Sequence, residues 1–196
     1  MNFFKTALAS MLLAAGCASA TTIDFEQANG TPGGVTSGVT IDTQGFTFLD
    51  AASIVDIAAG SVYSGNGPAH SGSYAALAEM SIITMSATNA GVFSLQGFWI
   101  HGFEGYGTAG SLTGYLNGIA TGSVLFSITD SWQNIAANFA RVDRIVISAD
   151  DAYMVDDIDA TINASDVPEP ASVALFGLGL AGLAYAMRRK PALSKR

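Results

Sequence analysis

Polar and apolar residues alternate in short runs between residues 20 and 165, and glycine, asparagine, serine and aspartate separate these runs. A two-residue period predicts β-strands that bury one face. No stretch of ten residues before Ala171 shows the 3.6-residue period of an amphipathic helix. The sequence therefore predicts an all-β body, with strands at 22–26, 45–49, 74–79, 82–87, 92–103, 111–117, 122–129, 134–139, 143–148 and 153–162.

Eight to ten strands at this spacing predict a sandwich of two sheets. In the long run 92–103 the alternation breaks at a glycine. A one-residue bulge at Gly97 would let Phe98 and Ile100 continue the buried face of the residues before it. Trp99 and His101 would then project outward.

The closing run 153–162 places an acidic residue in a buried position. Asp156 shares its parity with Met154 and Ile158, so its carboxylate should lie on the buried face. An isolated buried carboxylate is costly, and it requires backbone donors, a basic partner or a cation.

The N-terminal end has the features of an export signal. An apolar stretch precedes the small residues Ala18 and Ala20, which form a cleavage signal before Thr21. We expect residues 1–20 to be a signal peptide that the Sec machinery and signal peptidase process. Cys17 lies in this leader, so the mature chain would have no thiol; lipid modification of Cys17 is the alternative.

The C-terminal end has the features of a membrane anchor. An uncharged apolar run over 171–187 is preceded by Val167, Pro168, Glu169 and Pro170 and followed by Arg188, Arg189 and Lys190. A helix of this length spans roughly 26 Å, the short end of what crosses a bilayer. We expect a transmembrane helix over 170–188 and a basic cytoplasmic tail over 188–196.

This tail resembles the PEP-CTERM sorting signal of Gram-negative bacteria. The resemblance implies that an exosortase-type membrane peptidase binds the tail in the inner membrane and cuts near Pro168–Pro170. The body would then reach the cell surface or the extracellular polymer matrix. The expected domains are the signal peptide 1–20, a β-sandwich over 21–165 and a sorting signal over 166–196. A plain membrane anchor after a proline-rich linker is the alternative, and it also places the body outside.

The body is strongly acidic. Residues 21–165 contain 14 acidic and 2 basic side chains, so their net charge is about −12. This charge repels phosphate backbones and attracts divalent cations. We therefore expect no nucleic-acid partner.

Three motifs in the body carry a second resemblance. They are Asp24–Phe25–Glu26, the stretch from His70 to Leu77, and Val155–Asp156–Asp157–Ile158. Their order and spacing resemble the jelly-roll carbohydrate-binding modules of the galactose-binding-like fold. The resemblance implies a structural Ca²⁺ that joins the first and last strands through Glu26 and Asp156. In the alternative, these carboxylates bind only loop amides or solvent.

The sequence gives little support for catalysis. It contains no zinc-protease or serine-hydrolase motif. Adjacent carboxylates such as Asp156 and Asp157 should point to opposite faces of a strand rather than across a cleft. We expect a protein that is not an enzyme; a hydrolase acting on exopolysaccharide is the alternative. An ice-binding or adhesive surface would need a regular threonine-rich face, which the sequence lacks.

Aromatic side chains on the body predict a binding surface. Exposed aromatic rings commonly hold sugar rings by apolar contact. We expect Trp99, His101, Tyr106 and Tyr115 to bind carbohydrate, and Trp132 could join them. The alternative is that both tryptophans fill the core. The sequence thus predicts an exported matrix protein with a non-catalytic jelly-roll sandwich that binds carbohydrate and calcium.

Overall fold

A computed structural model describes residues 20–28, 30–37, 40–49, 52–79, 82–105, 107–163, 177 and 179–180. The chain divides into two compact units, Met1–Ala164 and Ser165–Arg196. The expected signal peptide lies outside the described residues except for Ala20, and the expected transmembrane helix does so except for three helical residues, Gly177, Gly179 and Leu180. None of the helices within the described ranges has both the length and the apolar character needed to span a membrane.

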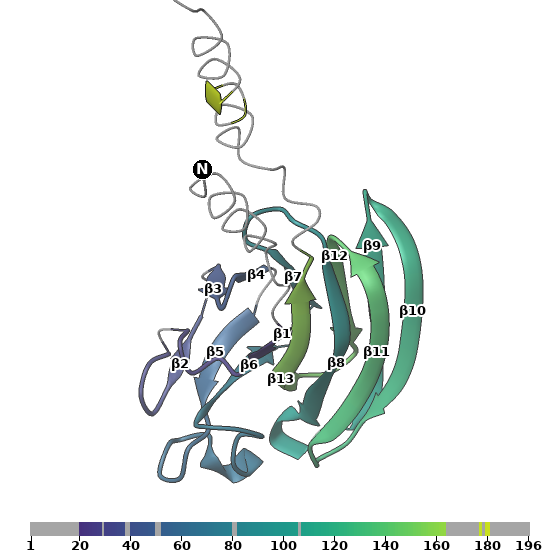
Figure 1. The fold of residues 1–196 in the computed structure, drawn as a ribbon. Coiled ribbons are helices and arrows are strands. Elements are labelled where there is room, and N and C mark those ends of the chain that lie inside the picture. Colours follow the sequence, from purple (N-terminus) through teal and green to yellow (C-terminus); the bar gives the residue numbers. More distant parts are fainter. Residues whose placement is uncertain are drawn as a thin grey trace, which may run out of the picture. The chain divides into compact units, whose positions relative to one another are not determined.

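The described part of the first unit is built from two antiparallel sheets (Figure 1). The first sheet has the order β11 (Gln133–Val142), β8 (Phe93–Gly102), β13 (Tyr153–Ile162), β6 (Tyr74–Ala78), β5 (Ala52–Asp56) and β2 (Val35–Thr36), and β1 (Ala20–Ile23) pairs with β13. The second has the order β10 (Ile119–Ile128), β9 (Thr108–Leu116), β12 (Arg144–Ala149), β7 (Ile82–Ala87), β4 (Phe46–Leu49) and β3 (Ile41–Thr43). Two short 3₁₀ turns, η1 (Ser64–Asn66) and η2 (Phe103–Gly105), complete the described elements. The predicted all-β sandwich is confirmed.

The main core lies between the two sheets and is rich in aromatic rings. Phe46 and Phe93 meet edge to face with centroids 5.3 Å apart, and Phe25 meets Phe48 in the same way at 5.2 Å. Each of these rings is fully buried. Burying one such side chain stabilises a fold by about 1.5–3 kcal/mol, so this layer holds the sheets together.

The predicted bulge at Gly97 is confirmed. The pairing of β8 with both neighbouring strands shifts at this glycine. Phe98 and Ile100 are fully buried in the same core cluster as Phe93. Trp99 therefore lies on the opposite, outer face of the first sheet.

A second bulge, in β13, corrects the predicted parity of that strand. Asp157 has a φ of 43°, and the pairing with β8 shifts between Asp156 and Asp159. As a result Val155 and Ile158 both enter the main core. The parity of the strand predicted that Asp156 shares a face with Ile158. Instead, Asp156 points to the outer side of the first sheet. It is nevertheless fully buried.

Residues 57–73, here called the covering segment, bury part of that outer face. A second apolar cluster joins side chains of the sheet to the segment: Val55, Ile57, Ala69, Ala75, Leu77, Phe103 and Met154. Strand β5 is consequently buried on both faces, from Ser53 to Asp56. The sheet thus presents to solvent only those outer-face residues that lie beyond this segment.

Candidate functional site

The three sequence motifs meet at the end of the covering segment. The Glu26 carboxylate accepts hydrogen bonds from the backbone N–H groups of Ser73 at 2.7 Å and Tyr74 at 2.8 Å. Gly72 has a φ of +58°, and a Cβ atom there would clash with the Glu26 carboxylate. Glycine at position 72 therefore permits this contact between the turn that follows β1 and the segment.

Asp156 also binds the covering segment, from the side of the sheet. Its carboxylate accepts hydrogen bonds from the backbone N–H groups of Ser71 at 3.0 Å and Asp157 at 2.8 Å. Burial raises the pKa of Asp156 from 3.8 to about 8; the negative charges of Asp157 and Glu26 act in the same direction, whereas the two N–H donors oppose it. At neutral pH this carboxyl group is therefore largely protonated.

Asp157 binds the segment beside Asp156. Its carboxylate accepts a hydrogen bond from the Ser71 hydroxyl at 2.7 Å and lies 2.5 Å from Nδ1 of His70. The expectation that Asp156 and Asp157 point to opposite faces was wrong here, because the left-handed backbone at Asp157 directs both toward the segment. These two carboxylates both anchor the covering segment.

Aromatic rings line the outer face next to this anchor. His70 stacks on Trp99 with ring centroids 3.7 Å apart and planes 18° apart. The ring centroid of Trp132 lies 6.0 Å from that of His70 and 5.2 Å from that of His101. The Trp132 indole N–H donates a hydrogen bond to the Pro68 carbonyl at 2.9 Å. Both tryptophans are half-buried, and neither belongs to the buried core between the sheets.

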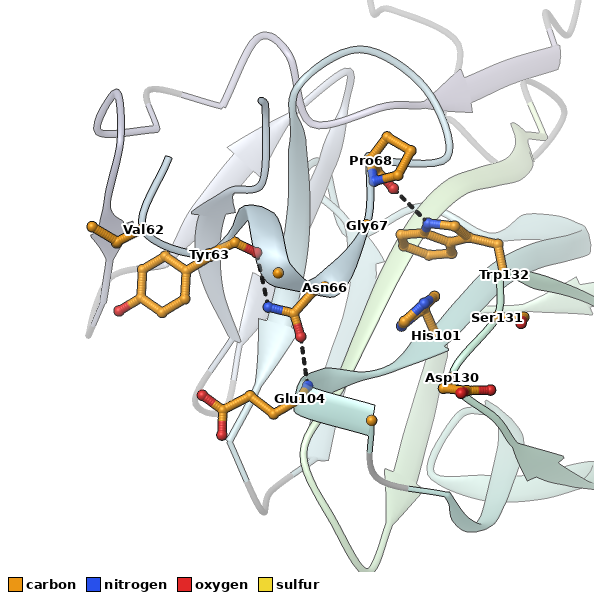
Figure 2. A pocket seen from close by; sticks show the side chains of 12 residues that line it. Val62, Tyr63, Asn66, Gly67, Pro68, His101, Glu104, Asp130, Ser131 and Trp132 are labelled. Carbon is orange, nitrogen blue, oxygen red and sulfur yellow. Dashed lines mark hydrogen bonds between the residues drawn. The ribbon is translucent and has the colours of Figure 1, made fainter. Parts of the chain in front are cut away.

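A pocket of about 700 Å³ opens between this aromatic cluster and the covering segment (Figure 2). Tyr63 lies on one side of it and Trp132 on the other. The Asn66 amide spans the floor: it donates to the Tyr63 carbonyl at 2.9 Å and accepts from the Glu104 backbone N–H at 2.5 Å. The complete lining is Val62, Tyr63, Gly65, Asn66, Gly67, Pro68, His101, Glu104, Gly105, Asp130, Ser131 and Trp132.

A second, smaller pocket of about 370 Å³ is lined in part by Trp99, the ring that stacks on His70. Trp99 forms part of its wall, with polar side chains around it. The lining residues are Thr22, Gln96, Gly97, Trp99, Asn134, Asp157 and Asp159. The aromatic cluster thus contributes Trp99 to this pocket and His101 and Trp132 to the larger one.

The structure does not bring all four predicted binding residues together. Trp99 and His101 share the outer face of the first sheet. Tyr115 belongs to β9 in the second sheet, where the Arg144 guanidinium lies 4.4 Å from its ring centroid. Tyr106 lies outside the described residues. Sequence reasoning did not find Tyr63 because it is in a loop without a periodic pattern.

The predicted calcium ligands fit only part of a metal site. Glu26 and Asp156 offer the hard oxygen atoms that Ca²⁺ prefers, and both contact the segment 71–74. Within the described ranges, no three acidic, histidine or cysteine side chains are grouped to hold a metal. The remaining ligands would have to be carbonyl oxygens and water. Both carboxylates accept loop amides, as the alternative expected, and calcium stays a prediction.

Solved structures similar to the body are carbohydrate-binding modules. TmCBM61, solved with β-1,4-galactotriose, is 22% identical over 71% of this chain and 94% of its own, with a TM-score of 0.37. The C-terminal family 22 module of Clostridium thermocellum Xyn10B is 11% identical over 76% and 96%, with a TM-score of 0.44. A CBM29-2 mutant is 15% identical over 79% and 99%, with a TM-score of 0.38.

The C-terminal segment gives a match of a different kind. No curated protein matches the chain. Residues 166–190, however, match the PEP-CTERM protein-sorting motif, which confirms the resemblance predicted from the sequence and indicates export and sorting to the cell surface. The chain thus joins a two-sheet β-sandwich to a C-terminal PEP-CTERM protein-sorting motif.

Proposed function

We propose that this chain is a cell-surface or extracellular-matrix protein whose β-sandwich binds a neutral polysaccharide without cleaving it. The observation that supports this proposal is the pocket between Tyr63 and Trp132. Its volume of about 700 Å³ lies within the range of small-molecule sites, roughly 300–1,000 Å³. Aromatic walls and a few polar groups are what a sugar ring requires.

The polar groups of the pocket suit sugar hydroxyls. Glu104 and Asp130 are exposed, and within the part of the chain that the structure describes their carboxylates make no hydrogen bond. Carboxylates accept hydrogen bonds from hydroxyl groups, while a tryptophan face packs against the C–H groups of a sugar ring. The same negative charges repel uronic acids, as does the net charge of the body. The proposal is therefore restricted to neutral glycans.

Replacing Trp132 by alanine tests this site. We expect the affinity for a neutral hexasaccharide of β-linked glucose, xylose or mannose to fall at least about tenfold, the equivalent of about 1.4 kcal/mol, because one aromatic wall is lost. Isothermal titration calorimetry of the full chain in mild detergent measures this affinity. Tyr115→Ala is the control, since Tyr115 lies on the other sheet.

Three results would contradict the proposal. In the first, the natural chain binds none of the three hexasaccharides. In the second, Trp132→Ala and Tyr115→Ala lose the same affinity. In the third, an oligomannuronate binds as tightly as the neutral hexasaccharides. Product analysis in the same samples addresses the alternative: release of shorter sugars would support a hydrolase.

We further propose that an exosortase-type peptidase of a Gram-negative inner membrane removes the tail and releases the body to the polymer matrix. The match at residues 166–190 supports this step. Intact mass of the mature protein should end near Pro168–Pro170 in normal cells and retain Arg188 to Lys190 in cells lacking the peptidase. An identical C-terminus in both strains would contradict it.

A further inference from the structure

Among the described strands, the main path of each sheet ends in two edge strands, and three of these four are protected; β1, which pairs only with β13, has just four residues. An edge strand exposes unpaired N–H and C=O groups, which proteins protect by short length, charge or bulges. Strands β2 and β3 have only two and three residues. Strand β11 is interrupted by two register shifts, with Asn138 at a φ of 53°.

The fourth edge strand, β10, lacks these protections over most of its length. It has ten residues, and none is charged or a proline. Its one register shift lies near its start, between Ala120 and Gly122, so residues 122–128 pair regularly with β9. Figure 1 shows β10 at the margin of the second sheet, and no described strand pairs with its other side. Leu125, near its middle, is 82% exposed.

The hydrogen bonding identifies the backbone groups on the free side. The Ser127 carbonyl accepts a hydrogen bond from the Gln133 side chain, which comes from β11 rather than from β9. Backbone groups of alternate residues in an antiparallel strand point to the same side. Those of Ser123 and Leu125 therefore also point away from β9, and Gln133 covers only the last of the three.

We propose that β10 pairs in antiparallel fashion with β10 of a second copy of this chain, centred on Val124. Ser123 of each copy would then exchange backbone hydrogen bonds with Leu125 of the other, and the two second sheets would join into one. Such a two-fold contact is self-complementary, because the small Ser123 side chain faces the large Leu125 side chain at both ends of the pair. This inference goes beyond the proposed function and does not rest on it.

Charge favours a second copy over a basic partner. Residues 21–165 carry a net charge of about −12, yet β10 has no charged residue. A basic partner would be drawn to the acidic surface rather than to this strand. In the self-pairing, no like charges meet across the two strands. The remaining repulsion acts between whole bodies and is screened by salt.

Sedimentation equilibrium of the full chain in density-matched detergent tests the pairing. We expect Leu125→Lys to weaken self-association at least tenfold, because it places a like charge on each side of the paired edge. Ala140→Lys adds the same charge to the other long edge strand and should have no effect. Raising NaCl from about 0.05 to 0.5 M should strengthen association of the natural chain. The C-terminal segment is the same in every variant, so its own association cancels.

Cysteine cross-linking tests the register. In a Cys17→Ser background, Val124→Cys should give a disulfide-linked dimer under mild oxidation, because facing residues at the centre of such a pair have Cα atoms about 4.5 Å apart. Ala140→Cys should stay monomeric. The proposal is overturned if the natural chain is monomeric at all concentrations, if both lysine variants behave alike, or if Ala140→Cys links as readily as Val124→Cys.

Discussion

Replacing Asp156 by asparagine should remove most of the pH dependence of folding stability between pH 5 and 8. Burial raises the pKa of this carboxyl group from 3.8 to about 8. Between these values the folded state keeps a proton that the unfolded state has lost, so stability falls as pH rises, by about 1.4 kcal/mol per pH unit. From pH 5 to 7.5 the natural chain should lose about 3 kcal/mol. Denaturant unfolding in EDTA measures this loss.

The control for this experiment is Asp150→Asn, which changes an exposed carboxylate. It should leave the slope of stability against pH unchanged. A natural chain that gains stability from pH 5 to 8 in EDTA would contradict the assignment. Calcium provides a further arm: if Glu26 and Asp156 hold the ion, CaCl₂ should stabilise the chain more at pH 8 than at pH 5, because protons compete for Asp156.

Gly97→Val should strongly destabilise the first sheet. A Cβ atom at this position would lie 2.7 Å from the Ile135 carbonyl oxygen of the neighbouring strand. That oxygen belongs to the backbone of β11 rather than to a flexible side chain. Because β13 pairs with β8 on the other side, β8 cannot shift away from β11 without disturbing that pairing. We expect a loss of about 3 kcal/mol in the free energy of unfolding.

A matched comparison replaces each of two glycines, Gly97 and Gly65, by alanine. Gly97→Ala should cost about 1–3 kcal/mol, whereas Gly65→Ala should be nearly neutral, because nothing lies within 4 Å of a Cβ atom there. Thermal melts of both variants compare them directly. Equal melting temperatures would mean that the Gly97 bulge is not a constraint on the sheet.

The sequence predicted every described strand of four or more residues except β5. All ten predicted strands overlap observed ones, and Gly97 was recognised because the apolar period visibly breaks there. Strand β5 was not predicted, because the covering segment buries its outer face and so removes the alternation. Strands β2 and β3 are too short to show a period.

The candidate site was only partly predictable for related reasons. The bulge at Asp157 uses a left-handed conformation without glycine, so no residue type marked it in the sequence. That single backbone change moved Asp156 from the core to the outer face. Trp99 and His101 could be found from their strand, whereas Tyr63 and His70 reach the site only through the path of the covering segment.

The two tryptophans give the most direct test of the binding site on the outer face of the first sheet. The chain contains only Trp99 and Trp132, so its ¹H–¹⁵N spectrum shows two indole signals, and Trp132→Phe assigns them. When the neutral hexasaccharide bound best by the full chain is titrated in, the Trp132 signal should shift in a saturable manner. If both indole signals stay in place while backbone signals of the second sheet move, the site is elsewhere and the account is contradicted.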